Sequence, residues 1–333
     1  MSLVVRMPSC RGVLALAASI AVAGAVAIPA GSPSAQAPAP IPIKVGTSGQ
    51  DANAECYYAY EMGFFKKNGL EADIHTIRRG SGAAVAAAAA GGSIDVGEAD
   101  VIAIAAAREH GLSLSILAPS SVFVANSPAS QLVVAKSATL KTAKDLEDKT
   151  VAVVSLEGPS KVATAKWLET NGANLSKIKF VELPQAQMPS SVERGAVAAA
   201  VMSEPTLTVA TSGNARVFAN SFESVGKRWQ IGAWFATTDW IKKNPDAAKR
   251  FVAALHETAL WANEKKNHPR SGAILDQYTK FDPDVLGKMT RATYAETIDP
   301  ATMQPILDAA TTYKSLQKSV SAKEMISTYA LAR

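Results

Sequence analysis

Cysteine and histidine are scarce in this chain, which has two and four of them respectively. No two histidines have the close spacing of a zinc site, and there is neither a G-x-S-x-G nucleophile motif nor a phosphate-binding lysine loop. Cys56 lies inside a predicted helix, where a buried, unreactive thiol is a simpler interpretation than a nucleophile. We therefore expect no metal, no cofactor and no catalytic residues.

Clustered positive charge is also lacking. The 34 Lys and Arg residues and 29 Asp and Glu residues give a formal net charge of +5, and the lysines are spread along the chain. Nucleic-acid binding requires a basic stripe, so we expect no nucleic-acid partner. With 48% hydrophobic and 19% charged residues, the 333-residue chain has globular composition and the length of about two domains.

The first 37 residues have the pattern of a Sec-type signal peptide. Arg6 and Arg11 precede an apolar stretch at 12–28, and Ala35-x-Ala37 is a candidate cleavage site, although Pro38 leaves the cleavage point open. Removal of this segment, which has no acidic residue, lowers the net charge from +5 to +3 and leaves a single cysteine, so no internal disulfide can form. No later run is long and apolar enough to span a bilayer. We expect export out of the cytoplasm.

Strand-like and helix-like segments alternate after residue 42. We expect strands at 43–47, 70–77, 93–96 and 112–117, a helix at 52–68, and a second strand–helix series from residue 150. Short turns between these segments predict parallel sheets covered on both faces by helices. Residues 120–130 lack periodicity and are expected to be a loop. After Asn244 the pattern is helical only.

Small residues dominate 80–97, the stretch around which the first half is organised. A helix of alanines can lie close to a sheet, and its start at Ser81 and Gly82 offers backbone N–H groups to a polar or anionic ligand. Taken alone, such a helix is as well explained as a tightly packed crossover helix.

Polar residues or glycines stand where each predicted strand ends and a helix begins. Ligands of open α/β sheets bind at the carboxyl ends of strands. Two lobes facing each other would therefore turn these residues toward one cleft. The carboxylates among them have an alternative role as helix caps and partners of the helix dipole.

Five motifs occur in order, at 54–74, 80–111, 140–154, 203–205 and 244–263. Together they resemble the periplasmic solute-binding proteins of ABC importers, in the group of nitrate-, sulfonate- and taurine-binding proteins and NMT1/THI5-like domains. The resemblance implies a type II periplasmic binding protein fold, with two α/β lobes, a hinge and a helical C-terminal tail on the first lobe. The implied boundaries are a signal peptide at 1–37, lobe 1 at 38–128, lobe 2 at 129–231, and a return to lobe 1 at 232–333.

The resemblance also implies where a ligand would be bound. Trp234 would either border it or lie in the hinge core, and Glu55 is a departure that adds a carboxylate near the cleft mouth. Carboxylates at 55, 98 and 204 with no obvious central arginine disfavour a simple inorganic anion and favour hydroxyl, amino or ring N–H groups. The expected ligand-binding residues are Gln50, Asp51, Glu55, Ser81, Gly82, Glu98, Ala99, Glu157, Gly158, Ser160, Glu204 and Trp234.

The expected function is capture, in the periplasm, of a small organic solute (a sulfonate, pyrimidine, aromatic or amine-like compound) by hinge closure. The solute would be delivered to an ABC permease in the inner membrane by a monomeric protein that is not an enzyme. Two alternatives stay open: an enzyme on the same scaffold, as in pyrimidine-synthase relatives, and a periplasmic ligand sensor. The ligand's identity is not predicted.

Overall fold

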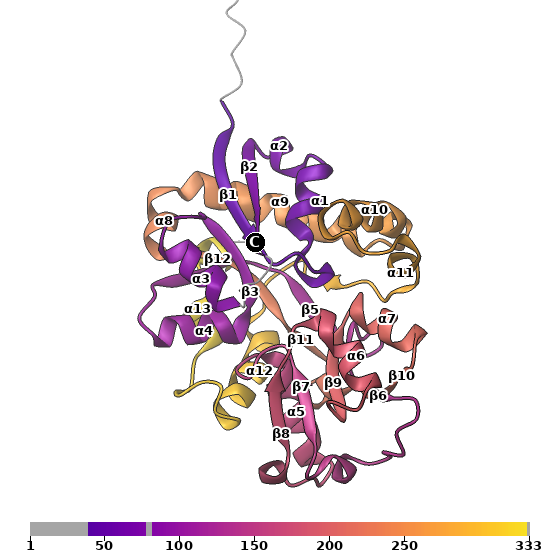
Figure 1. Cartoon of the computed structure of the whole chain (residues 1–333). Coiled ribbons are helices and arrows are strands. Elements are labelled where there is room, and N and C mark those ends of the chain that lie inside the picture. The colour runs from indigo at the N-terminus through magenta and orange to yellow at the C-terminus, as the bar shows by residue number, and fades with distance from the viewer. Residues whose placement is uncertain (1–38, 78–81, 332–333) are drawn as a thin grey trace, which may run out of the picture. The chain divides into compact units, whose positions relative to one another are not determined.

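The computed structural model describes residues 39–77 and 82–331 (Figure 1). The predicted signal peptide and Ser81 lie outside these ranges. Within the described residues no helix is both long and apolar enough to cross a membrane.

The first of two five-stranded sheets has the order β2-β1-β3-β12-β4. β1 runs parallel to β2 and β3, whereas β12 is antiparallel to both its neighbours. The strands are β1 (Ile41–Thr47), β2 (Leu70–Thr76), β3 (Val96–Asp100), β4 (Leu114–Pro119) and β12 (Gly232–Thr237).

The second sheet has the order β10-β6-β9-β7-β8 and repeats the topology of the first. β7 is parallel to β8 and β9, and β6 is the antiparallel strand. The strands are β6 (Ser130–Ala135), β7 (Thr150–Val153), β8 (Lys179–Glu182), β9 (Ala199–Ser203) and β10 (Ala215–Ala219). The expectation of purely parallel sheets is wrong because β6 and β12 are the strands by which the chain passes between the sheets.

A third sheet lies at these crossings, in the order β11-β5-β13, and is antiparallel. Its strands are β5 (Ser121–Val124), β11 (Arg228–Gln230) and β13 (Thr293–Tyr294). The loop predicted at 120–130 is therefore partly a strand, since four residues are too few to show a period. The two-residue β13 likewise interrupts the helical C-terminal part.

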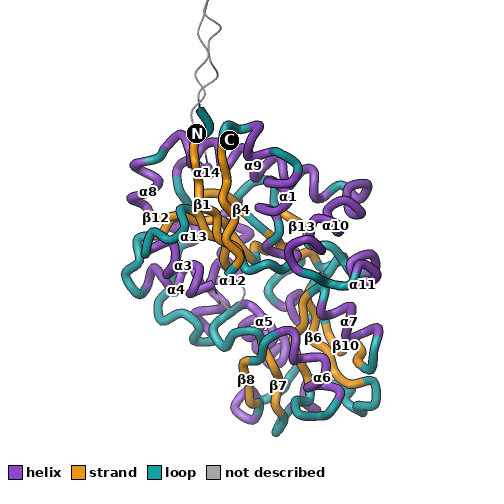
Figure 2. Tube along the Cα trace, turned by 45° about the horizontal axis from the view of Figure 1, so that its top comes forward, coloured by secondary structure: helices purple, strands orange, loops and turns teal. Residues whose placement is uncertain are grey.

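Helices cover the faces of both five-stranded sheets (Figures 1 and 2). The predicted helix at 52–68 is divided at Gly63, whose φ of 75° is a left-handed conformation that favours glycine. The longer helices are α1 (Glu55–Glu61), α3 (Gly82–Ala90), α4 (Val101–Glu109), α5 (Pro159–Thr170), α7 (Thr206–Ser212), α9 (Pro245–Asn263), α10 (His268–Thr279) and α12 (Pro300–Thr312). The shorter ones are α2 (Phe64–Lys67), α6 (Met188–Glu193), α8 (Thr238–Lys243), α11 (Pro283–Lys288), α13 (Ala322–Met325) and α14 (Thr328–Leu331).

Hydrophobic cores lie on either side of the sheets. One packs α1 and α9 on the first sheet, and another packs α6 and α7 on the second. The largest joins the other faces of both sheets through the aromatic rings of Phe123, Phe222 and Trp229 and through α12. The C-terminal part thus reaches both sheets: α12 packs on α5, and Tyr313 donates a 2.6 Å hydrogen bond to Glu169.

Candidate ligand-binding site

Asp51 follows the carboxyl end of β1 and is wholly enclosed by the protein. Its carboxylate accepts hydrogen bonds from Arg291, from the hydroxyl of Tyr58 at 3.0 Å and from the backbone N–H of Ala292 at 2.7 Å. Arg291 and Asp51 form an ion pair whose side chains are 8% and 2% exposed. The chain does contain a central arginine, contrary to the prediction, but its charge is matched by Asp51.

Glu55 and Glu98 lie together between the start of α1 and the first sheet. Trp234 donates a 2.7 Å hydrogen bond from Nε1 to Glu55 Oε2, and the amide of Asn53 donates to Glu98 Oε2. Both carboxyl groups are buried, and burial raises the pKa of Glu55 and brings that of Glu98 to about 8. Two of the predicted ligand-binding acids are therefore neighbours and hold protons readily.

Trp234 lies in the core, with no exposed surface, and packs edge-on against Phe251. This placement favours the hinge-core interpretation over direct contact with a ligand. Ala99, on the face of β3 opposite to Glu98, is also buried.

The start of α3 packs against α4 through its smallest residue. A Cβ atom on Gly82 would come 2.6 Å from Ala103 Cβ and 3.0 Å from Ala99 Cβ. Glycine is therefore required for the close approach expected of this helix. The packing explains Gly82 and Ala99 without a ligand, so their role in binding stays a prediction.

Glu204 follows the carboxyl end of β9 in the second sheet. It is buried, and its carboxyl group accepts hydrogen bonds from the N–H and hydroxyl of Thr208, both at 3.0 Å, and from the N–H of Thr290 at 3.3 Å. Thr290 precedes Arg291, the partner of Asp51. Segment 290–292 thus brings together acids that follow β1 and β9.

The remaining predicted residues are not linked by hydrogen bonds to these acids in the described part of the chain. Gln50 is half-buried before the 3-10 turn Asp51–Asn53, and Glu157 is exposed. Gly158 caps α5 with no side-chain hydrogen bond, and Ser160 is buried in its first turn. Among the described residues no hydrogen bond joins the start of α5 to the acids, so these positions stay predictions.

Three residues of the site were not predicted: Asn53, Ser120 and Arg291. Ser120 follows β4, and the rule that identified Glu98 and Glu204, a polar residue after a strand, would have found it. Arg291 lies between helices in a part of the sequence that shows no strand–helix alternation, so no pattern marked it.

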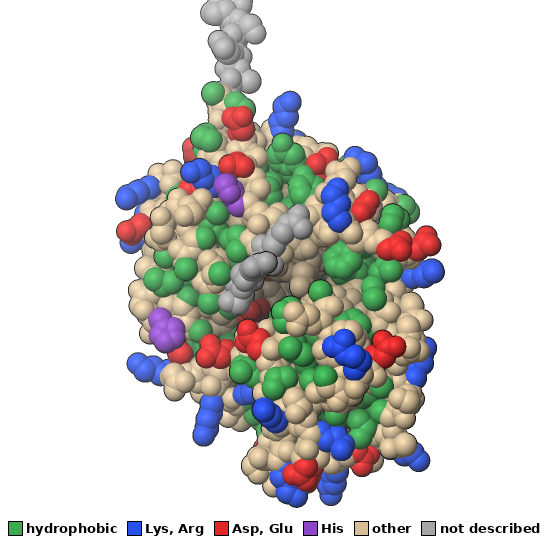
Figure 3. Space-filling model, viewed as in Figure 1, with side chains coloured by type: hydrophobic (Ala, Val, Ile, Leu, Met, Phe, Trp, Pro, Cys, Tyr) green, Lys and Arg blue, Asp and Glu red, His purple; other side chains and the backbone are tan. Residues whose placement is uncertain are grey.

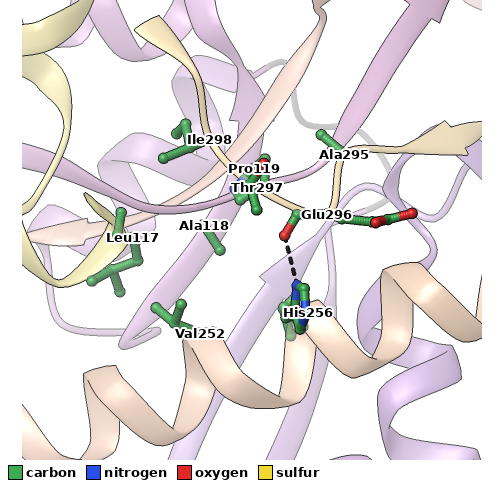
Figure 4. A pocket seen from close by; sticks show the side chains of 11 residues that line it. Leu117, Ala118, Pro119, Val252, His256, Ala295, Glu296, Thr297 and Ile298 are labelled. Atoms are coloured by element: carbon green, nitrogen blue, oxygen red, sulfur yellow. Dashed lines mark hydrogen bonds between the residues drawn. The ribbon is translucent and has the colours of Figure 1, made fainter. Parts of the chain in front are cut away.

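The space-filling view shows a hollow near the centre of one face, and Lys and Arg side chains are scattered around it rather than gathered (Figure 3). A separate cavity of about 70 Å³ lies between β4, α9 and segment 295–298 (Figure 4). His256 Nδ1 lies 2.8 Å from the carbonyl oxygen of Glu296 at its edge. No predicted ligand-binding residue lines this cavity.

Comparison with known families matches residues 51–270 to the family described as NMT1/THI5 like. The chain belongs to the NMT1/THI5-like family. No curated protein sequence matches it.

Solved structures share the fold of this NMT1/THI5-like chain at low sequence identity. The aliphatic sulphonate binding protein SsuA from Escherichia coli is 18% identical with a TM-score of 0.71, over 89% of this chain and 100% of that one. The nitrate-binding protein NrtA from Synechocystis PCC 6803 is 18% identical with a TM-score of 0.74, over 88% of each chain. The desulfurization enzyme DSZB is 12% identical with a TM-score of 0.63, over 88% of this chain and 98% of that one. The fold is that of the periplasmic binding proteins.

Proposed function

We propose that this protein is the solute-binding component of an ABC importer in the periplasm. It would capture a small organic solute between a lobe formed by 38–128 and 232–333 and a lobe formed by 129–231, and would pass it to a permease as a monomer. The arrangement that supports this best is the convergence of acids that follow β1 and β9 on segment 290–292. The two sheets have the same topology, and the carboxyl ends of strands are where open α/β sheets bind their ligands.

Binding would be reversible and coupled to movement of the two lobes about β5–β6 and β10–β12. No covalent step is required, since closure is driven by the difference in ligand affinity between two conformations. Small-angle scattering should then show a smaller radius of gyration when the ligand is added.

A thermal-shift screen of sulfonates, nitrate, aromatic carboxylates, pyrimidines and amines tests the proposal. A solute at a hundred times its Kd should stabilise the protein by about 2.7 kcal/mol. Failure of every solute class to raise the Tm would contradict the proposed function.

An enzyme on the same scaffold is the second candidate, because DSZB shares the fold. Conversion of a bound solute, followed by mass spectrometry, would favour it. A sensor would bind the same ligand, but deletion of the protein would leave solute uptake by cells unchanged, whereas loss of a transport component would abolish it.

A further inference from the structure

Glu55 and Glu98 each have one carboxyl oxygen without a hydrogen-bond partner in the described part of the chain. In both residues this is Oε1, and it is inaccessible to solvent. Their Oε2 atoms are bound by Trp234 and Asn53. A buried acceptor left unsatisfied destabilises a protein, so an arrangement with two of them side by side requires an explanation.

The two carboxyl groups lie near each other and near the side chain of Ser120. The hydroxyl of Ser120 interacts with both carboxyl groups and lowers the pKa of each, whereas the charge of Glu98 raises the pKa of Glu55. The Ser120 hydroxyl itself points to the carbonyl oxygen of Ala52 at 3.4 Å. Glu98 Oε1 also lies against Gly232, where any side chain would collide with it. A glycine in strand β12 therefore leaves the room that this carboxyl group occupies.

The donor side chains of Arg291 and Gln230 already have acceptors, whereas the buried hydroxyl of Ser121 has no partner among the described residues. The guanidinium of Arg291 bonds to Asp51, Tyr58, Ser271 and the carbonyl of His268. The amide of Gln230 donates to the carbonyl oxygens of Ser121 and Gly232. The other titratable groups that interact with the two acids include Cys56 on α1, Asp100 on β3 and Tyr294 on β13, and none of them supplies a positive charge at neutral pH.

We propose that Glu55 and Glu98 form the subsite that selects the solute, and that it takes a cationic nitrogen group with at least two N–H donors, such as an amine, amidine or amino-heterocycle. This rests on the proposed function. The two Oε1 atoms accept the N–H groups, while Asn53, half-buried at the end of the 3-10 turn, holds Glu98 by donating to its Oε2. In their ionised form the two carboxyl groups only accept hydrogen bonds, so they repel sulfonates and nitrate, which also carry only acceptors.

Proton release distinguishes this subsite from a buried pair with a purely structural role. Burial keeps Glu98 protonated at pH 7, and a bound cation favours its ionised form. One proton therefore passes from Glu98 to the buffer as the cation binds, and affinity should rise by up to about tenfold per pH unit between pH 6 and 8.

Isothermal titration calorimetry of the purified protein provides the test. The probes are butylamine, benzamidine and 4-aminopyridine, compared with butanesulfonate and nitrate, in phosphate and in Tris at pH 7. We expect a nitrogen probe to bind with release of about one proton. The near-isosteric variants Glu98→Gln and Glu55→Gln should lose about tenfold or more in affinity, and Glu98→Gln should abolish the proton release.

Glu223→Gln is the matched control, because Glu223 is exposed and belongs to the 3-10 turn Ser221–Ser224, away from both acids. It should bind as the original protein does. The proposed subsite is overturned if butanesulfonate or nitrate binds in preference to all nitrogen probes and binds folded Glu98→Gln with the same affinity. That outcome would still support solute binding. Absence of binding for every class in this titration and in the wider screen overturns the proposed function itself.

Discussion

Arg291 Nη2 lies 2.8 Å from Asp51 Oδ1, although the two residues are 240 positions apart in the chain. The pair fixes the end of β1 to the segment before β13. Because each oxygen of Asp51 already has protein donors, we infer that Asp51 positions the site rather than contacting a ligand. Direct contact between Asp51 and a ligand stays a prediction.

Replacing Arg291 by methionine should destabilise the protein by about 3–5 kcal/mol, because it leaves the carboxylate of Asp51 buried without its counter-ion. Urea unfolding measures this. Arg270→Met, at an exposed position on α10, should change the free energy of unfolding by no more than about 0.5 kcal/mol. The double variant Asp51→Asn with Arg291→Met should recover part of the loss. Equal effects of Arg291→Met and Arg270→Met would contradict this account.

Stability should depend on pH through Glu98. Its pKa is raised by burial to about 8 in the folded protein, so the folded state binds a proton more tightly than the unfolded state. The stabilisation is complete below the unfolded pKa of about 4.3 and is lost as pH rises through the folded pKa. The free energy of unfolding should therefore fall between pH 5 and 8, by an amount on the order of a few kcal/mol.

The variant Glu98→Gln should flatten this dependence, because glutamine does not titrate. Guanidinium unfolding at pH 5, 6.5 and 8 measures it, and Glu223→Gln should keep the original slope. Glu55, whose pKa burial also raises, would leave a residual slope of the same sign in Glu98→Gln. A profile for Glu98→Gln that matches the original protein would show that Glu98 is ionised in the fold.

The contact between Gly232 and Glu98 gives a prediction about packing. A methyl group at 232 would collide with the Glu98 carboxyl group, so Gly232→Ala should destabilise the protein by about 1–3 kcal/mol. Combined with Glu98→Ala, which removes the colliding group, the same change should have a smaller effect. Gly226→Ala is a suitable control because its nearest neighbour would be 3.8 Å away. Simple additivity of the two substitutions, measured by thermal unfolding, would exclude the collision.

Much of the fold was predictable from the sequence because each strand–helix unit of the two large sheets carries its own local signal. Apolar strands such as β1 and β7, and the proline-marked starts of α9 and α12, can be read from neighbouring residues. The direction of β12 and the existence of β13 cannot be read from neighbouring residues, since both depend on pairing with strands more than a hundred residues away.

The acids of the site were predicted by the same local rule, but their partners were not. Glu204 follows the end of β9, as expected of a ligand-binding residue, whereas Glu98 lies inside β3, because that strand continues beyond its predicted end at 96 to Asp100. Sequence alone does not show that Arg291 neutralises Asp51, that Trp234 bonds to Glu55, or that Thr290 bonds to Glu204. These contacts join remote segments, and their effect is to leave Glu55 and Glu98 as the acids with unsatisfied oxygens.

Glu204 provides the last prediction, which concerns the contact between the second sheet and segment 290–292. Glu204→Ala removes the acceptor for the N–H groups of Thr208 and Thr290. Buried donors without partners should lower the free energy of unfolding by about 1–3 kcal/mol. More specifically, the amide of Thr290 should exchange its hydrogen faster, since that exchange follows the loss of its hydrogen bond.

Hydrogen-exchange mass spectrometry with a peptide covering Thr290 measures the effect. Glu193→Ala is the matched control, because Glu193 is an exposed acid on α6 that bonds only to Asn214 among the described residues. It should leave the protection of Thr290 unchanged. Peptides from α12 should be equally protected in both variants, because α12 is held by α5 and by the shared core rather than by Glu204. Unaltered protection of Thr290 in Glu204→Ala would mean that this amide is held by another acceptor, and Glu204 would then be free to contact a ligand.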